Sequence, residues 1–239
     1  MHSATLKKIG YITLYYIIAI VLRYYILILK PAFFKDADYF LQILLEGIGP
    51  LIGALLMIKV FKRPNELSIF PIGIQKSIVL ILIPVILFTL VGIINIGHPY
   101  YIGGPKLLFG AILYGAFEEI GWRGYLQAEL NGLKKFHKYL IIAILWYVWH
   151  LDFGFDIQHL FFFGIILFGT YGMGIVAEKT KSLVLVALFH AFFNLYYIVN
   201  SLEGITSNQI LIILTISIIS ILYVMKNEKK SVLLKKNTD

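Results

Sequence analysis

Two adjacent carboxylates and an arginine lie inside an otherwise apolar run of the sequence. Glu118, Glu119 and Arg123 interrupt the run from 107 to 130, and ionisable groups at such positions in a bilayer are costly and rarely without a function. Glu119 and Arg123 are spaced i, i+4 and share one helical face, where the arginine neutralises that carboxylate. Glu118 lies about 100° around the helix, so we expect it to face a cavity and act as a general base towards water. A structural ion pair between helices is the alternative, but such a pair needs one carboxylate.

Two histidines and an asparagine lie in two further apolar runs. Trp146 and His150 are spaced i, i+4, so the indole ring can pack against the imidazole. His190 and Asn194 have the same spacing and project from one helical face. A single histidine inside a membrane is as often a hydrogen-bonded core residue as a functional one. A rise of about 1.5 Å per residue places these groups at a similar depth, so we expect them to share a water-activating pocket with Glu118.

The composition indicates an all-α membrane protein. Hydrophobic residues make up 59% and charged residues 14% of the 239 residues, against about 45–50% and about 25% in soluble domains. Apolar runs of spanning length predict a bundle of about eight transmembrane helices around an intramembrane polar cavity. The runs cover roughly 9–29, 39–58, 77–96, 107–130, 139–151, 159–177, 183–200 and 208–225. Turn residues such as Gly103-Gly104-Pro105 and Asn131-Gly132 separate them.

No polar stretch is long enough to fold alone, which predicts one integral membrane domain over 1–239. Its motif-bearing core covers about 105–200, and 226–239 forms a cytoplasmic tail. Most basic residues fall on alternate linkers, and the other linkers carry only Lys30, Lys35 and Lys106. The positive-inside rule therefore predicts a multi-pass protein of the cell membrane with both termini in the cytoplasm.

The net charge of +8 does not indicate a nucleic-acid partner, because the charges lie at segment ends rather than along one face. The absence of cysteine excludes a thiol nucleophile, a disulfide framework and a cysteine metal site. The high content of Ile, Lys and Asn favours a bacterial source.

Five further charged or titratable residues receive no catalytic role. Arg23 and Glu46 are intramembrane charges, and we expect them to pair with each other because each needs a partner. Asp152, Asp156 and His159 have spacings that suit a metal, but a solvated acidic loop is the better interpretation.

The three groups of polar residues together resemble the motifs of the CPBP family, the membrane-embedded CAAX proteases and bacteriocin-processing enzymes, also called the abortive-infection family. The motifs are Glu118-Glu119-x-x-x-Arg123, Trp146-x-x-x-His150 and His190-x-x-x-Asn194. Their order and spacing match, and the resemblance covers about 40 to 200. Trp146 departs from the family, which usually has Phe there, but it keeps an aromatic ring beside the histidine.

This resemblance implies hydrolysis of a peptide bond inside the membrane. Glu118 and His150 would hold and deprotonate the attacking water, and the arginine would orient the second carboxylate. His190 and Asn194 would stabilise the tetrahedral oxyanion. The favoured mechanism uses no cofactor. The alternative is Zn²⁺ bound by Glu118, His150 and His190 with water as the fourth ligand.

Three classes of function follow from these residues. The first is an intramembrane endopeptidase whose substrate is a small hydrophobic peptide or a membrane-anchored protein, held in contact with membrane lipid. The second is a non-catalytic immunity or scaffold protein that binds a peptide, in which the polar groups are hydrogen bonds between helices. The third is a proton-coupled transporter, which ranks last because the sequence has no inverted repeat or paired broken helices.

Overall fold

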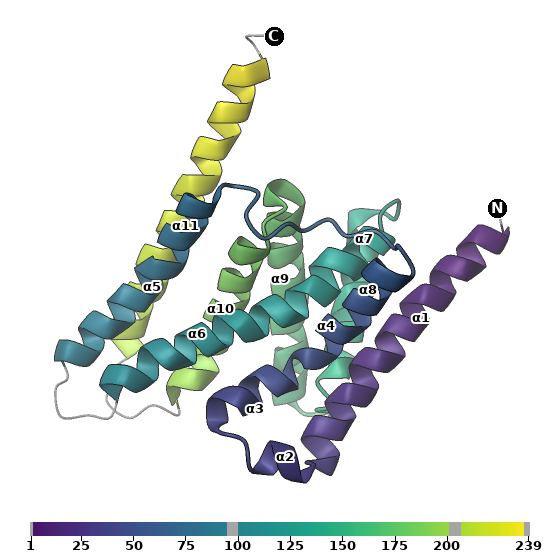
Figure 1. Cartoon of the computed structure of the whole chain (residues 1–239), viewed down its shortest axis with the longest axis horizontal. Coiled ribbons are helices and arrows are strands. Elements are labelled where there is room, and N and C mark those ends of the chain that lie inside the picture. The colour runs from purple at the N-terminus through teal and green to yellow at the C-terminus, as the bar shows by residue number, and fades with distance from the viewer. Residues whose placement is uncertain (1, 95–99, 201–206, 237–239) are drawn as a thin grey trace.

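The computed structural model describes residues 2–94, 100–200 and 207–236, and every named element within them is a helix (Figure 1). Pairing of extended backbone is limited, in these ranges, to an isolated parallel bridge between Ser68 and Ser182. The all-α class predicted from the sequence is therefore confirmed.

Each predicted apolar run corresponds to one helix or to a bent series of helices. The elements are α1 (His2–Tyr24), η1 (Tyr25–Leu29), α2 (Ala32–Lys35), α3 (Tyr39–Glu46), α4 (Ile48–Leu55), η2 (Leu56–Val60), α5 (Ile74–Ile94), α6 (Tyr100–Glu119), η3 (Ile120–Leu126), α7 (Gln127–Glu129), α8 (Lys135–Trp149), α9 (Ile157–Thr180), α10 (Leu183–Asn200) and α11 (Ser207–Lys236), where η denotes a π-helix. The turn expected at Gly103-Gly104-Pro105 is wrong, because α6 begins at Tyr100 and Pro105 lies inside it. Helix α11 continues to Lys236, so much of the predicted tail is helical.

Within the described ranges, two helical segments are long and apolar enough to cross a membrane, namely Thr5–Leu29 and Ile157–Thr180. A third span is present if the pair Tyr39–Glu46 and Ile48–Val60, bent by 46°, is counted as one. Shorter apolar helices cover Ile74–Leu90, Leu183–Asn194 and Leu211–Tyr223. The chain is a membrane protein by this measure, and the number of about eight spans stays a prediction.

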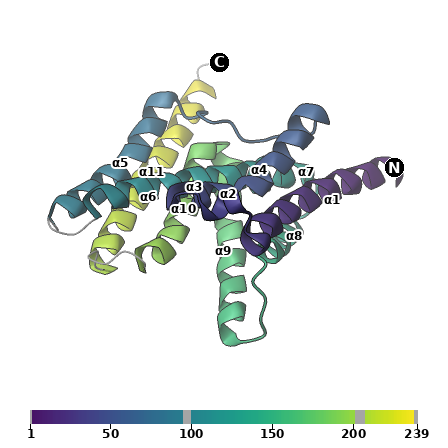
Figure 2. The ribbon, with the colours of Figure 1, turned by 60° about the horizontal axis from the view of Figure 1, so that its bottom comes forward.

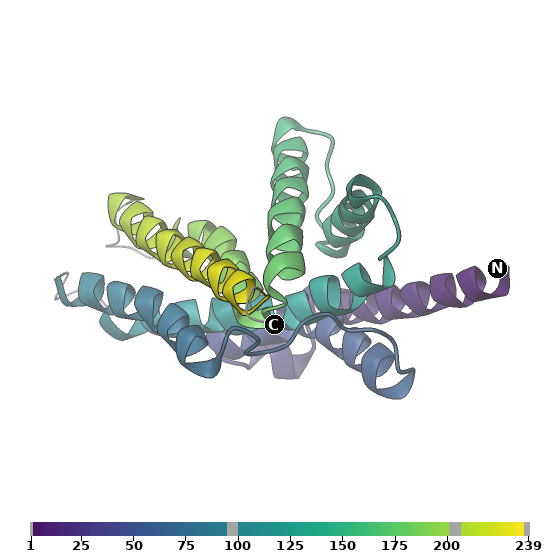
Figure 3. The ribbon, with the colours of Figure 1, turned by 90° about the horizontal axis from the view of Figure 1, so that it is seen from above.

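Helix α6 runs through the centre of the molecule (Figure 1), and α10 is its main packing partner. Helix α1 packs against α4, and α5 lies beside α11. Helix α9 projects out of the layer that contains α1, α5 and α6, and it contacts α8 and α10 (Figures 2 and 3). This arrangement surrounds the end of α6, where the two glutamates lie, with α4, α8, α9 and α10.

The chain leaves α-helical geometry directly after the glutamate pair. Residues Ile120–Leu126 form the π-helix η3, and six of its seven residues are buried. The continuous α-helix expected over 107–130 is therefore wrong in this stretch. Single π-turns inside helices are frequent at functional sites, and here the wider turn directly follows Glu119.

The contact between α1 and α4 depends on a glycine. A Cβ atom at Gly49 would lie 2.5 Å from the carbonyl oxygen of Ala19, which is backbone and cannot rotate away. A Cβ at Gly10, by contrast, has nothing within 4 Å. We expect Gly49→Ala to reduce the free energy of unfolding by about 1–3 kcal/mol through overpacking.

Thermal unfolding of the purified protein in detergent measures this prediction. Gly10→Ala is the matched control, and it should be neutral or slightly stabilising because Ala is the better helix former. Equal unfolding temperatures for the two variants would show that the α1–α4 contact is not as tight as the structure has it.

Candidate active site

Glu118 is completely buried, and one of its two carboxylate oxygens is fixed by indoles. The Nε1 atoms of Trp122 and Trp146 donate hydrogen bonds to its Oε2 at 3.1 and 2.7 Å. Its Oε1 has no hydrogen-bond partner among the described residues. The Nε2 atom of His190 lies 3.9 Å from that oxygen. Glu118 is thus held by two indoles at one oxygen, and the Tyr114 side chain also hydrogen-bonds to the carboxylate.

Glu119 connects the end of α6 to α10. Its Oε1 accepts from Arg123 Nη1 at 2.9 Å and from His190 Nδ1 at 2.6 Å. Because a carboxylate only accepts, Nδ1 carries a proton and Nε2 of the same ring faces Glu118. The Arg123 guanidinium also lies 4.7 Å above the Trp146 ring. The predicted i, i+4 pair of Glu119 and Arg123 is confirmed, with both side chains fully buried.

The approach of α6 to α10 sets these distances. A Cβ at Gly115, one turn before the glutamates, would lie 3.0 Å from the Ala187 carbonyl oxygen and 3.2 Å from His190 Cβ. A larger residue at this position would push the two helices apart. The small residue therefore brings His190 within reach of both carboxylates.

His150 follows the last residue of α8 and is oriented by its own helix. Its Nδ1 lies 2.7 Å from the Trp146 carbonyl oxygen, and its ring centre is 5.7 Å from that of Trp146. The ring of Phe162 packs edge-on against it at 5.1 Å. The imidazole interacts electrostatically with Glu118. The expected packing of Trp146 on His150 is confirmed.

A cavity of about 710 Å³ adjoins the buried groups. His150 and Asn194 both line it, together with Tyr114. Glu118 and His190 are buried and are not among the residues that line it. The expectation that Glu118 faces the cavity directly is therefore wrong, because the two indoles and neighbouring helices enclose its carboxylate.

The six predicted site residues thus fall into two adjoining sets. The buried set contains Glu118, Glu119, Arg123 and His190, and the cavity set contains His150 and Asn194. Trp146 joins the two sets, because its indole donates to Glu118 and its ring packs against His150.

Several residues of the site were not singled out from the sequence. Trp122 donates to Glu118 and Tyr114 lines the cavity. Each lies four residues from Glu118, so helical spacing was the available signal. Arg23 and Glu46 also line the cavity, and their predicted pairing is confirmed by an Nη1–Oε2 distance of 3.4 Å.

The acidic loop between α8 and α9 lies at the edge of the cavity. Asp152 and His159 line it, and the His159 ring contacts Asp152 at 3.3 Å and Asp156 at 2.8 Å. Asp156 also accepts from the backbone N–H of His159, and these hydrogen bonds lower the pKa of its carboxyl group. Asp156 therefore caps the N-terminus of α9.

The residues considered for zinc do not form a metal site in this arrangement. Across the described residues, no group of three or more His, Asp or Glu side chains is placed to hold a metal ion. Glu118, His150 and His190 are among the described residues, and the Nδ1 of His150 lies against the Trp146 carbonyl oxygen.

Comparison with known proteins gives one family match. Residues 104–196 match the family model of Rce1-like proteins, described as type II CAAX prenyl endopeptidases. This stretch contains all three motifs. This part of the chain is similar to that family. No curated protein matches the chain. The proteins that this model describes are proteases.

The Trp146 indole, which stands where the CPBP motif usually has Phe, donates a hydrogen bond to the buried Glu118 carboxylate. We expect Trp146→Phe to lower the free energy of unfolding by about 1–3 kcal/mol more than a variant that loses a hydrogen bond between neutral groups. The reason is that a hydrogen bond to a charged acceptor is stronger than one to a neutral acceptor. Trp149→Phe is the matched control, since the Trp149 Nε1 donates to the Ala19 backbone carbonyl at 3.1 Å.

Denaturant titration of both variants in the same detergent gives the comparison. Equal losses would mean that the indole of Trp146 does not stabilise a charged Glu118.

Proposed function

We propose that this protein is an intramembrane endopeptidase that uses Glu118 and His150 to activate a water molecule. The arrangement of the Glu118 carboxylate carries this proposal. Two indoles donate hydrogen bonds to its Oε2. Its Oε1 has no hydrogen-bond partner among the described residues and lies 3.9 Å from His190 Nε2. A fixed carboxylate with one free oxygen beside an imidazole suits a general base.

The proposed reaction is a hydrolysis in which every proton has a place. Glu118 Oε1 takes a proton from a water molecule that His150 helps to hold, as the water oxygen bonds to the carbonyl carbon of the peptide. His190 carries a second proton on Nε2 when it is charged, and it donates to the developing oxyanion together with the Asn194 amide. The C–N bond then breaks as the leaving amine receives the proton from Glu118. The new carboxylic acid keeps the second proton of the water until it ionises in solvent, and it leaves with the amine through the cavity.

The properties of the cavity support a peptide substrate of mixed character. Its wall combines the side chains of Tyr39, Ile43 and Phe162 with the polar groups of His150 and Asn194. Apolar residues would bind the flanks of a hydrophobic or membrane-associated peptide, and the polar groups would orient the bond to be cut. In a bacterial cell, removal of a leader from a secreted peptide fits such a substrate.

The role of Glu118 is tested by Glu118→Gln. We expect the cleavage rate to fall about 10²–10⁴-fold, because the amide cannot take a proton from water. The assay follows cleavage of short synthetic hydrophobic peptides by the purified protein in liposomes, with products identified by mass spectrometry. Glu66→Gln is the control, since Glu66 contacts Lys181 and Asn131 away from the site and its loss should leave the rate unchanged.

If the folded Glu118→Gln variant cleaves the peptides at the wild-type rate, Glu118 has no role in catalysis. Unfolding temperatures of both variants show whether any loss is one of folding.

Metal dependence is tested separately. On the proposed glutamate mechanism, a zinc chelator such as 1,10-phenanthroline should leave the cleavage rate unchanged. Inactivation by the chelator, followed by recovery on addition of Zn²⁺ and not Mg²⁺, would instead place a metal in the reaction.

A non-catalytic peptide-binding protein is the second candidate, and the contacts of Glu119 favour it. This carboxylate joins α6 to α10 through His190, as a helix-to-helix hydrogen bond in a scaffold would. Mass spectrometry of small peptides from wild-type cells and a Glu118→Gln strain separates the two. The protease predicts a longer precursor in the variant strain, and the scaffold predicts identical peptides.

A further inference from the structure

Four buried side chains beside the candidate active site have polar atoms without a hydrogen-bond partner. They are Glu119, Arg123, Gln127 and Thr170, and each is exposed by 2% or less. The unpartnered atoms, judged over the described residues, are Glu119 Oε2, Arg123 Nε and Nη2, Gln127 Oε1 and the Thr170 hydroxyl. Leaving one such atom unpaired costs about 1–3 kcal/mol, so a set of five requires an explanation.

These atoms are neighbours rather than scattered. Gln127 is one turn beyond Arg123, and its Nε2 donates to the Gly174 carbonyl of α9 at 3.2 Å. The Tyr139 ring lies against the Gly174 backbone, and Thr170 is one turn before Gly174 on the same helix. Tyr139 also interacts electrostatically with Arg123. The set therefore lies between η3, α7, α8 and α9.

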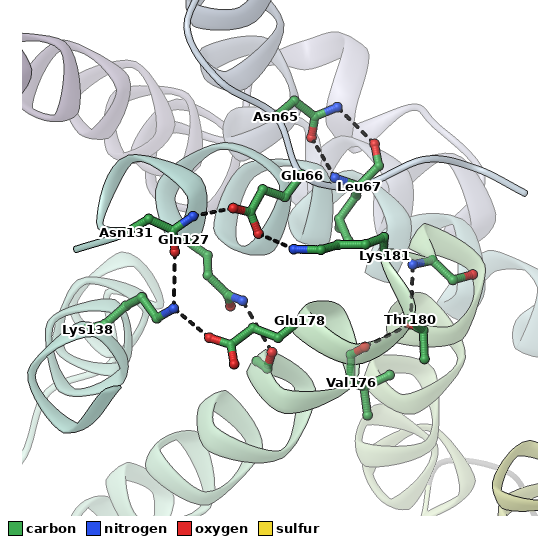
Figure 4. Close-up of polar contacts among 12 residues, drawn as sticks. Asn65, Glu66, Leu67, Gln127, Asn131, Lys138, Val176, Glu178, Thr180 and Lys181 are labelled. Atoms are coloured by element: carbon green, nitrogen blue, oxygen red, sulfur yellow. Dashed lines mark hydrogen bonds and ion pairs between the residues drawn. The ribbon is translucent and has the colours of Figure 1, made fainter. Parts of the chain in front are cut away.

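The set ends at a charged cluster formed by Lys135, Lys138 and Glu178, which we call the lysine-rich face. The Tyr139 side chain hydrogen-bonds to Glu178. Glu178 also binds Lys138 at 2.5 Å and the exposed Lys135 at 3.0 Å. Figure 4 shows Gln127, Lys138 and Glu178 converging from three helices. Polar groups thus continue from the Glu119–Arg123 pair to the surface.

We propose that these side chains hold a chain of buried water molecules that joins the active site to the lysine-rich face. A buried water typically makes about three hydrogen bonds to polar groups that would otherwise be unsatisfied, which suits the mixture of donors and acceptors here. The inner end is Glu119, whose other oxygen binds the Nδ1–H of His190.

The position of this water path gives it a function in hydrolysis, and this part rests on the proposed function. His150 lies at the end of α8, and Lys138 lies near its beginning. The cavity and the water path therefore approach the site from opposite ends of the same helix. A peptide that fills the cavity blocks that side, and the water path still supplies water and exchanges protons with His190 through Glu119.

The presence of water is tested by X-ray radiolytic labelling of the full chain in liposomes, in which hydroxyl radicals from bound water modify nearby side chains. We expect Tyr139 to be labelled more strongly than Phe88, a core residue of α5 with the same 2% exposure. Thr170→Val should lower the labelling of Tyr139 at least about twofold, because it removes one of the groups that binds the water. Thr89→Val, which loses an ordinary hydrogen bond to Val85, is the matched control.

Peptide cleavage gives the second readout. Thr170→Val should lower kcat about five- to tenfold, equivalent to about one hydrogen bond, with KM unchanged. Thr89→Val should alter neither constant.

The two readouts separate the two proposals. Labelling of Tyr139 no stronger than that of Phe88 overturns the water path, whatever the activity. Strong labelling in a protein that cleaves no peptide keeps the water path and contradicts the proposed function. If Thr170→Val and Thr89→Val have equal kcat values, the water path does not contribute to catalysis.

Discussion

One carboxylate oxygen, Glu119 Oε1, holds the centre of this structure together. It accepts from Arg123 on its own helical segment and from His190 on α10, both within 3 Å and away from solvent. Removing one partner of such a buried set costs about 3–5 kcal/mol, because the remaining charge is left without compensation. The contact fixes both the approach of α10 to α6 and the orientation of the His190 ring.

The adjacent glutamate differs from Glu119 because its partners differ. Trp122 and Trp146 donate to one oxygen of Glu118, and neither neutralises its charge. Glu119 is compensated by a guanidinium and serves as an anchor. Two neighbouring residues of the same type thus take separate tasks, since consecutive side chains on a helix point in different directions. The π-helical turn that follows places Arg123 beside Glu119 and Trp122 beside Glu118.

The contacts that follow from helical spacing were predicted from the sequence. The Glu119–Arg123 pair and the packing of Trp146 on His150 are both i, i+4 relations, which a local repeat determines. The pairing of Arg23 with Glu46 followed from the high cost of an isolated charge in a membrane.

The features that depend on long-range packing were not predicted. Enclosure of Glu118 behind the cavity requires the indole of Trp146, which comes from another helix. The switch from α6 to η3 likewise has no signal in the hydrophobic pattern, because tertiary contacts decide which hydrogen-bonded turn is stable. The motif residues were therefore identified from spacing, but their division between a buried set and a cavity set was not.

The most direct test of this account is an experimental structure of the Glu118→Gln protein with an uncleaved hydrophobic peptide. The account predicts that the peptide fills the cavity beside His150 and Asn194, with one carbonyl group within hydrogen-bonding distance of His190 Nε2 and next to residue 118. A peptide bound on the lipid-facing surface, or one whose carbonyl groups are all remote from His190, would contradict it.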